Sequence, residues 1–295
     1  MEGATRRGTA EGGPTNGTLL RRILAVAEVL AVVAGAAFVW LLVSRLTPAK
    51  GWERKWFGGW FVLKILLLTV LPMGLLVATR RSLGRHGISF HGLRYQVGIG
   101  LLAMAVVLPA SFSFGVLLWL GIGFAEWRGA LILAPVELAA TMGVGLLLRR
   151  QPTRKEHRRG SGVGVYLAVL ATVTVLSAAT RGLVPQVSRF AGQFFVTGFG
   201  EEIMFRGYVQ SRLNHSFGRP WRLFGTAVGP GLVIASILFG LIHWAQSGGT
   251  VWWALWTTCS GLLLGFLREK TGGIVAPGIV HGLPQAIGVL VSPGI

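Results

Sequence analysis

The sequence predicts an all-α fold, a polytopic transmembrane helix bundle of about eight to nine spans. Apolar residues make up 52% of the 295 residues and charged residues only 13%, a composition typical of membrane proteins. Several apolar runs reach the roughly 20 residues that a helix needs to cross a bilayer. These runs do not alternate between polar and apolar residues as membrane strands do, so we expect helices.

The elements follow in order along the chain. Residues 1–22 are polar and rich in glycine, which predicts a disordered cytoplasmic tail. Nine apolar segments come next, at about 23–44, 57–79, 97–122, 129–148, 162–182, 190–212, 225–246, 250–267 and 272–292. The basic segment RRQPTRKEHRRG separates N-terminal transmembrane helices, in residues 23–160, from a C-terminal helix bundle in residues 161–295. We expect the second group to carry the chemistry.

The basic residues predict the orientation. Most of them lie in segments on the same side of the predicted spans as the N-terminus, which places the N-terminus in the cytoplasm. The outer segments hold fewer: Arg45, Lys50, Arg54, Lys55, Arg128, Arg181 and Arg189. Because the net charge of +18 lies in short loops beside apolar helices, it argues against nucleic acid as a partner and favours anionic lipids.

Ionisable side chains inside the spans need a reason to persist, because each costs at least a few kcal/mol in hydrocarbon. They are Glu28, Lys64, Glu137, Glu201, Glu202, Arg206, His243 and His281. We expect Glu28 and Lys64 to pair with each other or with a neighbouring helix, or to reach the interface. The only cysteine, Cys259, leaves no intramolecular disulfide and no CxxC metal site.

The stretch GFGEEIMFRGY places two adjacent glutamates on one helix. Neighbours on a helix point about 100° apart, so Glu201 and Glu202 face different directions. Glu202 and Arg206 have the i, i+4 spacing at which their side chains meet on one face, and pairing would neutralise both charges. Glu201 is then the unpaired carboxylate and a candidate general base for water. A buried ion network that only holds helices together is the structural alternative.

Two later spans each carry one imidazole, His243 in FGLIH and His281 in HGLPQ. Together with EEIMFR, these motifs resemble, in order and spacing, the three motifs EExxxR, FxxxH and HxxxN of the CPBP intramembrane endopeptidases. That family is also called the CAAX protease and bacteriocin-processing (Abi) family, and the resemblance is to its type II CAAX prenyl proteases. It covers about residues 190–292, and it departs from the family at Gln285, which stands where the third motif has asparagine.

The resemblance implies an intramembrane peptide hydrolase that acts on membrane-embedded or lipidated substrates. It implies that Glu201 and His243 activate the attacking water, and that His281 and the residue at Gln285 polarise the scissile carbonyl and hold the oxyanion. The extra methylene of glutamine moves the amide donor by about an ångström or more, and oxyanion stabilisation depends on donor placement. The catalytic set is then Glu201, Glu202, Arg206, His243, His281 and Gln285.

The sequence leaves open whether the site holds a metal ion. Glu201, His243 and His281 could hold Zn²⁺ with an open water position, but no HExxH motif is present. The family is described both as metalloproteases and as metal-independent glutamate proteases, and we favour no cofactor.

The alternatives to a protease are a non-catalytic relative with an immunity, chaperone or receptor role, and a transporter that uses the buried charges. A transporter predicts related halves with broken helices, and the sequence shows no such repeat. Frequent glycine, arginine in preference to lysine and no aspartate fit a prokaryote, so we expect the plasma membrane. We also expect the catalytic cavity to open on the inner side, where Arg206, Arg212 and the 212–224 loop lie.

Overall fold

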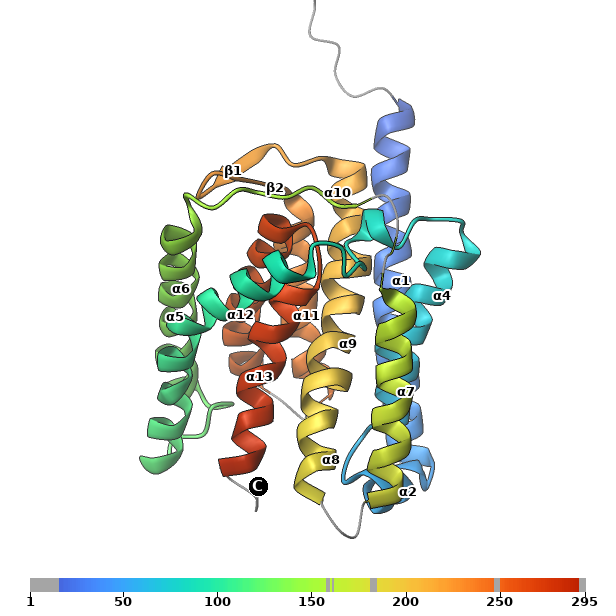
Figure 1. Cartoon of the computed structure of the whole chain (residues 1–295), viewed down its shortest axis with the longest axis vertical. Helices are drawn as coiled ribbons and strands as arrows, with labels where there is room; N and C mark the ends of the chain where they lie inside the picture. The colour runs from blue at the N-terminus through green and yellow to red at the C-terminus, as the bar shows by residue number, and fades with distance from the viewer. Residues whose placement is uncertain (1–15, 158–159, 161, 181–184, 247–249, 292–295) are drawn as a thin grey trace, which may run out of the picture.

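The computed structural model describes residues 16–157, 160, 162–180, 185–246 and 250–291. In this part of the chain, helices run side by side in one bundle (Figure 1). Four of them are long and apolar enough to cross a bilayer: α1 (Asn16–Leu46), α5 (Leu93–Trp119), α6 (Trp127–Leu148) and α7 (Val163–Thr180). One bent helix pair makes a fifth if the pair is counted as one span, and two shorter apolar helices accompany them. The all-α membrane bundle is confirmed, while the number of eight to nine spans stays a prediction.

The first helix is longer than the sequence pattern predicts. It begins at Asn16, so residues 16–22 are helical and do not belong to a disordered tail. The physical reason is that this stretch contains leucines and arginines, which are good helix formers, and the helix therefore extends beyond its apolar part. Residues 1–15 of the expected tail lie outside the described residues.

A sharp bend precedes the second span. The segment consists of α2 (Ala49–Phe57), α3 (Val62–Lys64), the π-helix η1 (Ile65–Val70) and α4 (Leu71–Ala78), followed by the short 3₁₀ helix η2 (Gly84–His86). The bend between α2 and the rest is 107°. The buried Glu53 carboxylate accepts hydrogen bonds from the backbone N–H groups of Phe61, Val62 and Leu63. These N–H groups lack partners at a helix start, so Glu53 fixes where the span begins and places Lys64 in its first turn.

The C-terminal half contains the predicted motifs. It comprises α8 (Pro185–Ala191), η3 (Gly192–Gly198), α9 (Phe199–Glu202), η4 (Ile203–Gln210), α10 (Ser211–Phe217), β1 (Trp221–Leu223), β2 (Thr226–Val228), α11 (Pro230–Gln246), α12 (Val251–Thr271) and α13 (Val275–Val291). Both η3 and η4 are π-helices, and they flank the two glutamates. A π-helical stretch is rare and often marks a functional site.

The predicted span at 225–246 is wrong at its start, because β1 and β2 form an antiparallel hairpin there. Phe224 and Gly225 connect the strands with φ angles of 48° and 77°. Positive φ at both turn residues matches the twist of a tight hairpin. The apolar helix α11 therefore begins only at Pro230.

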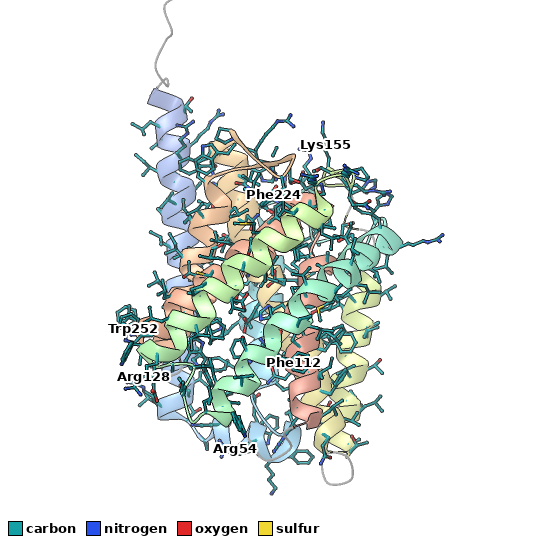
Figure 2. The ribbon with its side chains drawn as sticks, turned by 90° about the vertical axis from the view of Figure 1, so that its left-hand side faces the viewer. Arg54, Phe112, Arg128, Lys155, Phe224 and Trp252 are labelled. Carbon is teal, nitrogen blue, oxygen red and sulfur yellow. The ribbon has the colours of Figure 1, made fainter. Side chains whose placement is uncertain are left out.

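A single buried cluster runs through the bundle and includes residues of α1, α5 and α6 as well as α11, α12 and α13. Helix α12 packs between α11 and α6, and α13 packs on α5 and η3. The start of α1 and the β hairpin lie at one end of the bundle, here called the hairpin end, and α2 lies at the opposite end, here called the α2 end (Figure 1). Figure 2 shows Lys155 and Phe224 near the hairpin end, and Arg54 and Arg128 toward the α2 end.

Candidate active site

The ion pair predicted from the i, i+4 spacing is present. One guanidinium nitrogen of Arg206 lies 3.1 Å from Glu202 Oε1, and both side chains are fully buried. A second nitrogen of Arg206 donates to the carbonyl oxygen of Gly261 on α12, at 3.1 Å. The guanidinium also lies over the ring of Phe239 on α11, 4.6 Å from the ring centre. Arg206 thus neutralises Glu202 and ties its helix to α11 and α12.

His281 of α13 lies between the two glutamates. Its Nδ1 lies 2.9 Å from Glu202 Oε1, and because an ionised carboxylate can only accept, Nδ1 donates this hydrogen bond. Its Nε2 lies 3.6 Å from Glu201 Oε2. Within the described part of the chain, Glu201 Oε2 has no hydrogen-bond partner. Glu201 is therefore the carboxylate without an ion pair to arginine, as the sequence predicts.

His243 of α11 lines the same cavity as Glu201. Its Nδ1 lies 2.7 Å from the carbonyl oxygen of Phe239 and donates a hydrogen bond to it, so Nε2 is the nitrogen available as an acceptor. The ring of Phe239 packs edge-on against both His243 and His281, at centroid distances of 4.5 and 5.6 Å. Phe239 thereby fixes the positions of both imidazoles.

A cavity of 640 Å³ reaches the site and is here called the Glu201 cavity. Glu201, His243 and Gln285 line it together, and Gln285 is an exposed residue of α13. Its outer wall consists of Trp40, Ser44, Arg45, Lys50, Trp60 and Trp253, among others. These residues lie at or near the end of α1, in α2, after α2 and at the start of α12, so the cavity opens at the α2 end.

The cavity does not open near Arg212 and the 212–224 loop, so this part of the expectation is wrong. The reason is that Arg206, which served as the marker of the open side, is fully buried and holds the Gly261 carbonyl. Arg212 donates instead to Glu28 at 2.9 Å and does not line the Glu201 cavity.

The charges outside the motifs have separate partners. Glu28 binds Arg81, Arg212 and the hydroxyl of Tyr208, so it does not pair with Lys64. Glu137 of α6 forms a side-chain hydrogen bond with Ser260 of α12.

Lys64 is the site residue that sequence reasoning missed. Its Nζ donates to Thr197 Oγ1 at 2.9 Å, and Lys64 lines the Glu201 cavity. The sequence signal that could have identified it is a single lysine within an apolar span, because an ionisable residue in a membrane often marks a functional site.

The described residues do not fit a metal ion. Among them, no group of three His, Cys, Asp or Glu side chains converges so that it could hold one. His281 Nδ1 is occupied by Glu202, and its Nε2 faces the Glu201 carboxylate at 3.6 Å. We therefore derive no step through Zn²⁺.

Glycines allow the helices of the site to approach closely. A Cβ on Gly198 of η3 would lie 2.5 Å from the Cα of Gly282, the residue after His281. A Cβ on Gly261 would lie 2.9 Å from the Cα of Ser236 on α11. Because backbone meets backbone at both places, a side chain there would push α13 or α12 away from the glutamates.

The bundle and this site define an integral membrane protein with a carboxylate–imidazole centre at the Glu201 cavity. Residues 183–287 match the model of the family described as type II CAAX prenyl endopeptidase Rce1-like, and this segment contains all three motifs. The match confirms the resemblance found in the sequence and supports a protease with a peptide or protein substrate in the membrane. No curated protein and no solved structure matches the chain.

Proposed function

We propose that the protein is an intramembrane endopeptidase in which Glu201 activates the attacking water. The observation that carries the proposal is that Glu201 lines the cavity with His243 and Gln285, while Glu202 is bound to Arg206 and His281. A second cavity of 30 Å³, lined by apolar side chains together with Lys64 and Glu201, is large enough for a water molecule. Glu201 thus lines both a water-sized cavity and the larger Glu201 cavity.

In the proposed reaction, a water oxygen attacks the scissile carbonyl carbon while Glu201 takes one of its protons. The carbonyl π electrons move to oxygen, and the amide of Gln285 donates to this oxyanion. His243 Nε2 accepts a hydrogen bond from the water and orients it. The carbon–nitrogen bond then breaks, Glu201 returns its proton to the leaving amine, and the products are a carboxylic acid and an amine.

His281 acts as a positioning residue in this scheme, and so does Glu202. His281 Nδ1–H is committed to Glu202, so Nε2 can share the proton that Glu201 acquires. Glu202 and Arg206 keep the imidazole in this tautomer, as a buried carboxylate does for a catalytic histidine. The position of His281 behind Glu201 supports this role in preference to polarising the substrate carbonyl.

We also propose that the N-terminus faces the cytoplasm of a prokaryotic cell, which is the side favoured by the distribution of arginine and lysine. Anionic lipid would then contact the described part of the basic segment RRQPTRKEHRRG, residues 149–157, at the hairpin end. The Glu201 cavity would open on the outer side of the membrane. Addition of a membrane-impermeant thiol reagent to cells that carry Ser44→Cys tests this orientation.

The test of the activity is cleavage by purified protein in lipid vesicles, with a panel of apolar peptides and membrane-anchored substrates with and without a prenylated cysteine. We expect wild type to cleave at least one substrate and Glu201→Gln to lose this cleavage by a factor of about 10² or more. Glu137→Gln is the matched control, because Glu137 is also an intramembrane glutamate but hydrogen-bonds Ser260 outside the cavity.

A chelator added to each protein separates the two chemistries. Cleavage that resists the chelator supports a glutamate-activated water without metal, whereas loss with chelator and recovery with zinc would assign the water to a metal ion. If wild type cleaves nothing that Glu201→Gln leaves intact, the two glutamates form a structural network, and the non-catalytic alternative replaces the protease.

A further inference from the structure

Two cavities at the α2 end of the bundle meet at Lys64. The Glu201 cavity has a volume of 640 Å³, and a neighbouring cavity of the same volume, here called the Arg54 cavity, is lined by residues of α2, α8 and η3. Both are lined by Trp60, Lys64, Gln193 and Thr197. Lys64 therefore stands between the catalytic carboxylate on one side and the Arg54 cavity on the other.

The Glu201 cavity and the Arg54 cavity together are here called the vestibule. Basic residues surround it, although the predicted outer segments contain few basic residues. The outer basic residues that the structure describes are Arg45, Lys50, Arg54, Lys55, Arg128 and Arg189, and all of them except Arg128 line one of the two cavities. Outer loops of membrane proteins are depleted in lysine and arginine, so their concentration around one opening needs a local reason. A ring of one sign of charge around a cavity attracts ligands of the opposite sign.

The inner end of the vestibule has one cation with donors to spare. An ammonium group has three donors, and Lys64 Nζ donates one hydrogen bond, to Thr197 Oγ1 at 2.9 Å. Glu53 and Glu201 are the carboxylates whose charge acts on Lys64, but neither lies within ion-pair distance of it among the described residues. Glu53 is occupied by the backbone N–H groups at the start of α3.

We propose that Lys64 binds a carboxylate of the substrate, and that the basic ring draws this carboxylate into the vestibule. This inference rests on the proposed peptidase activity, because a peptide presents a carboxylate at its C-terminus or on an acidic side chain. The single ammonium matches the charge of one carboxylate, and Thr197 and Gln193 add neutral polar groups beside it. The scissile bond of such a peptide lies toward Glu201, which lines the same cavity as Lys64.

Binding can be measured apart from cleavage, because Trp40, Trp60 and Trp253 line the Glu201 cavity and report on a ligand by their fluorescence. The probes are three short apolar peptides of the same sequence. The first ends in a free carboxylic acid and the second in an amide. The third has glutamate as its last residue and also ends in an amide, so that its only carboxylate is on a side chain. The protein is held in vesicles of phosphatidylcholine. Lys64→Met is compared with wild type, with the charge-keeping Lys64→Arg and with Arg128→Met, which removes an outer cation away from the cavities.

We expect wild type and Arg128→Met to bind the free acid at least about tenfold more tightly than the amide. Lys64→Met should bind both equally, and Lys64→Arg should recover part of the preference. Tight binding of the glutamate peptide would assign the carboxylate to a side chain, and weak binding would assign it to the chain terminus.

Equal binding of acid and amide by wild type overturns the proposal, and so does a preference that survives in Lys64→Met. If phosphatidylglycerol in the vesicles abolishes the preference of wild type, the vestibule binds a lipid headgroup and the proposal is wrong. Cleavage of the amide peptide by wild type tests the peptidase activity separately. Failure of carboxylate binding at Lys64 can therefore be distinguished from failure of the peptidase activity. If Lys64 merely neutralises Glu201, Lys64→Met lowers cleavage of acid and amide peptides by the same factor.

Discussion

Replacement of Arg206 by leucine tests whether the buried ion pair organises the site. The change removes a donor to Glu202 Oε1 and a donor to the Gly261 carbonyl, both at 3.1 Å, and the contact with the Phe239 ring. It leaves the fully buried Glu202 carboxylate with His281 as its remaining partner among the described residues. Breaking a buried pair by removal of one partner costs about 3–5 kcal/mol, so we expect Arg206→Leu to lower the free energy of unfolding by that amount.

A double substitution separates the charge from the packing. In Arg206→Leu with Glu202→Gln the uncompensated charge is gone, and we expect a free energy of unfolding about 2 kcal/mol closer to wild type than in the single arginine variant. The assay is unfolding in mixed micelles of increasing dodecyl sulfate fraction, followed by tryptophan fluorescence. Arg85→Leu at an exposed position of η2 is the control and should stay within about 0.5 kcal/mol of wild type. Additive costs in the double variant, or a cost below about 1 kcal/mol for Arg206→Leu, would refute the reasoning.

Three further predictions concern the packing, the pH response and the oxyanion donor. Gly198→Ala places a methyl group 2.5 Å from the Gly282 Cα, so we expect a loss of about 1–3 kcal/mol in unfolding free energy together with lower cleavage, measured in the same micelle assay. Burial lowers the pKa of His86 from 6.5 to about 4, so the unfolded chain binds more protons between these values and stability falls by up to about 3 kcal/mol as the pH drops from 6.5 to 4. The unfolding free energy of His86→Gln should depend less on pH over this range than that of wild type, because His215, which packs against His86, still titrates there. An equal pH dependence in both proteins would contradict the assignment. Gln285→Ala should lower kcat by a factor of about 10² with little change in KM, and an unchanged kcat would remove Gln285 from the site.

The predicted division between the two glutamates was obtainable from spacing alone. The i, i+4 rule pairs Glu202 with Arg206, and the pair is present even though Arg206 lies in the π-helix η4. The long apolar helices α1, α5, α6 and α7 were predictable from the apolar runs for the same local reason. Both features depend on residues close together in the sequence.

Features that depend on distant contacts were not predictable. Lys64 reaches the cavity where Glu53 binds the first backbone N–H groups of α3, after a bend of 107°. Gly58 and Gly59 indicate the end of α2, but the sequence does not show that Glu53 caps the next helix. The side on which the cavity opens depends on where Arg206 points, and its buried contact with Gly261 comes from a helix far along the chain. The hairpin before α11 requires positive φ at Phe224, a residue type that rarely adopts it.

The proposed chemistry of the site depends on the different hydrogen-bond partners of two neighbouring carboxylates. Oε1 of Glu202 receives both Arg206 and His281 Nδ1, so its charge is balanced and its geometry is fixed by three helices. Glu201, one residue earlier, lines the cavity, and the other nitrogen of the same imidazole lies 3.6 Å from its Oε2. Because His281 connects the two carboxylates, Glu202→Gln should displace the imidazole and lower kcat while leaving peptide binding intact. A loss of binding without a loss of kcat would instead mean that the pair holds the cavity open and does not position Glu201.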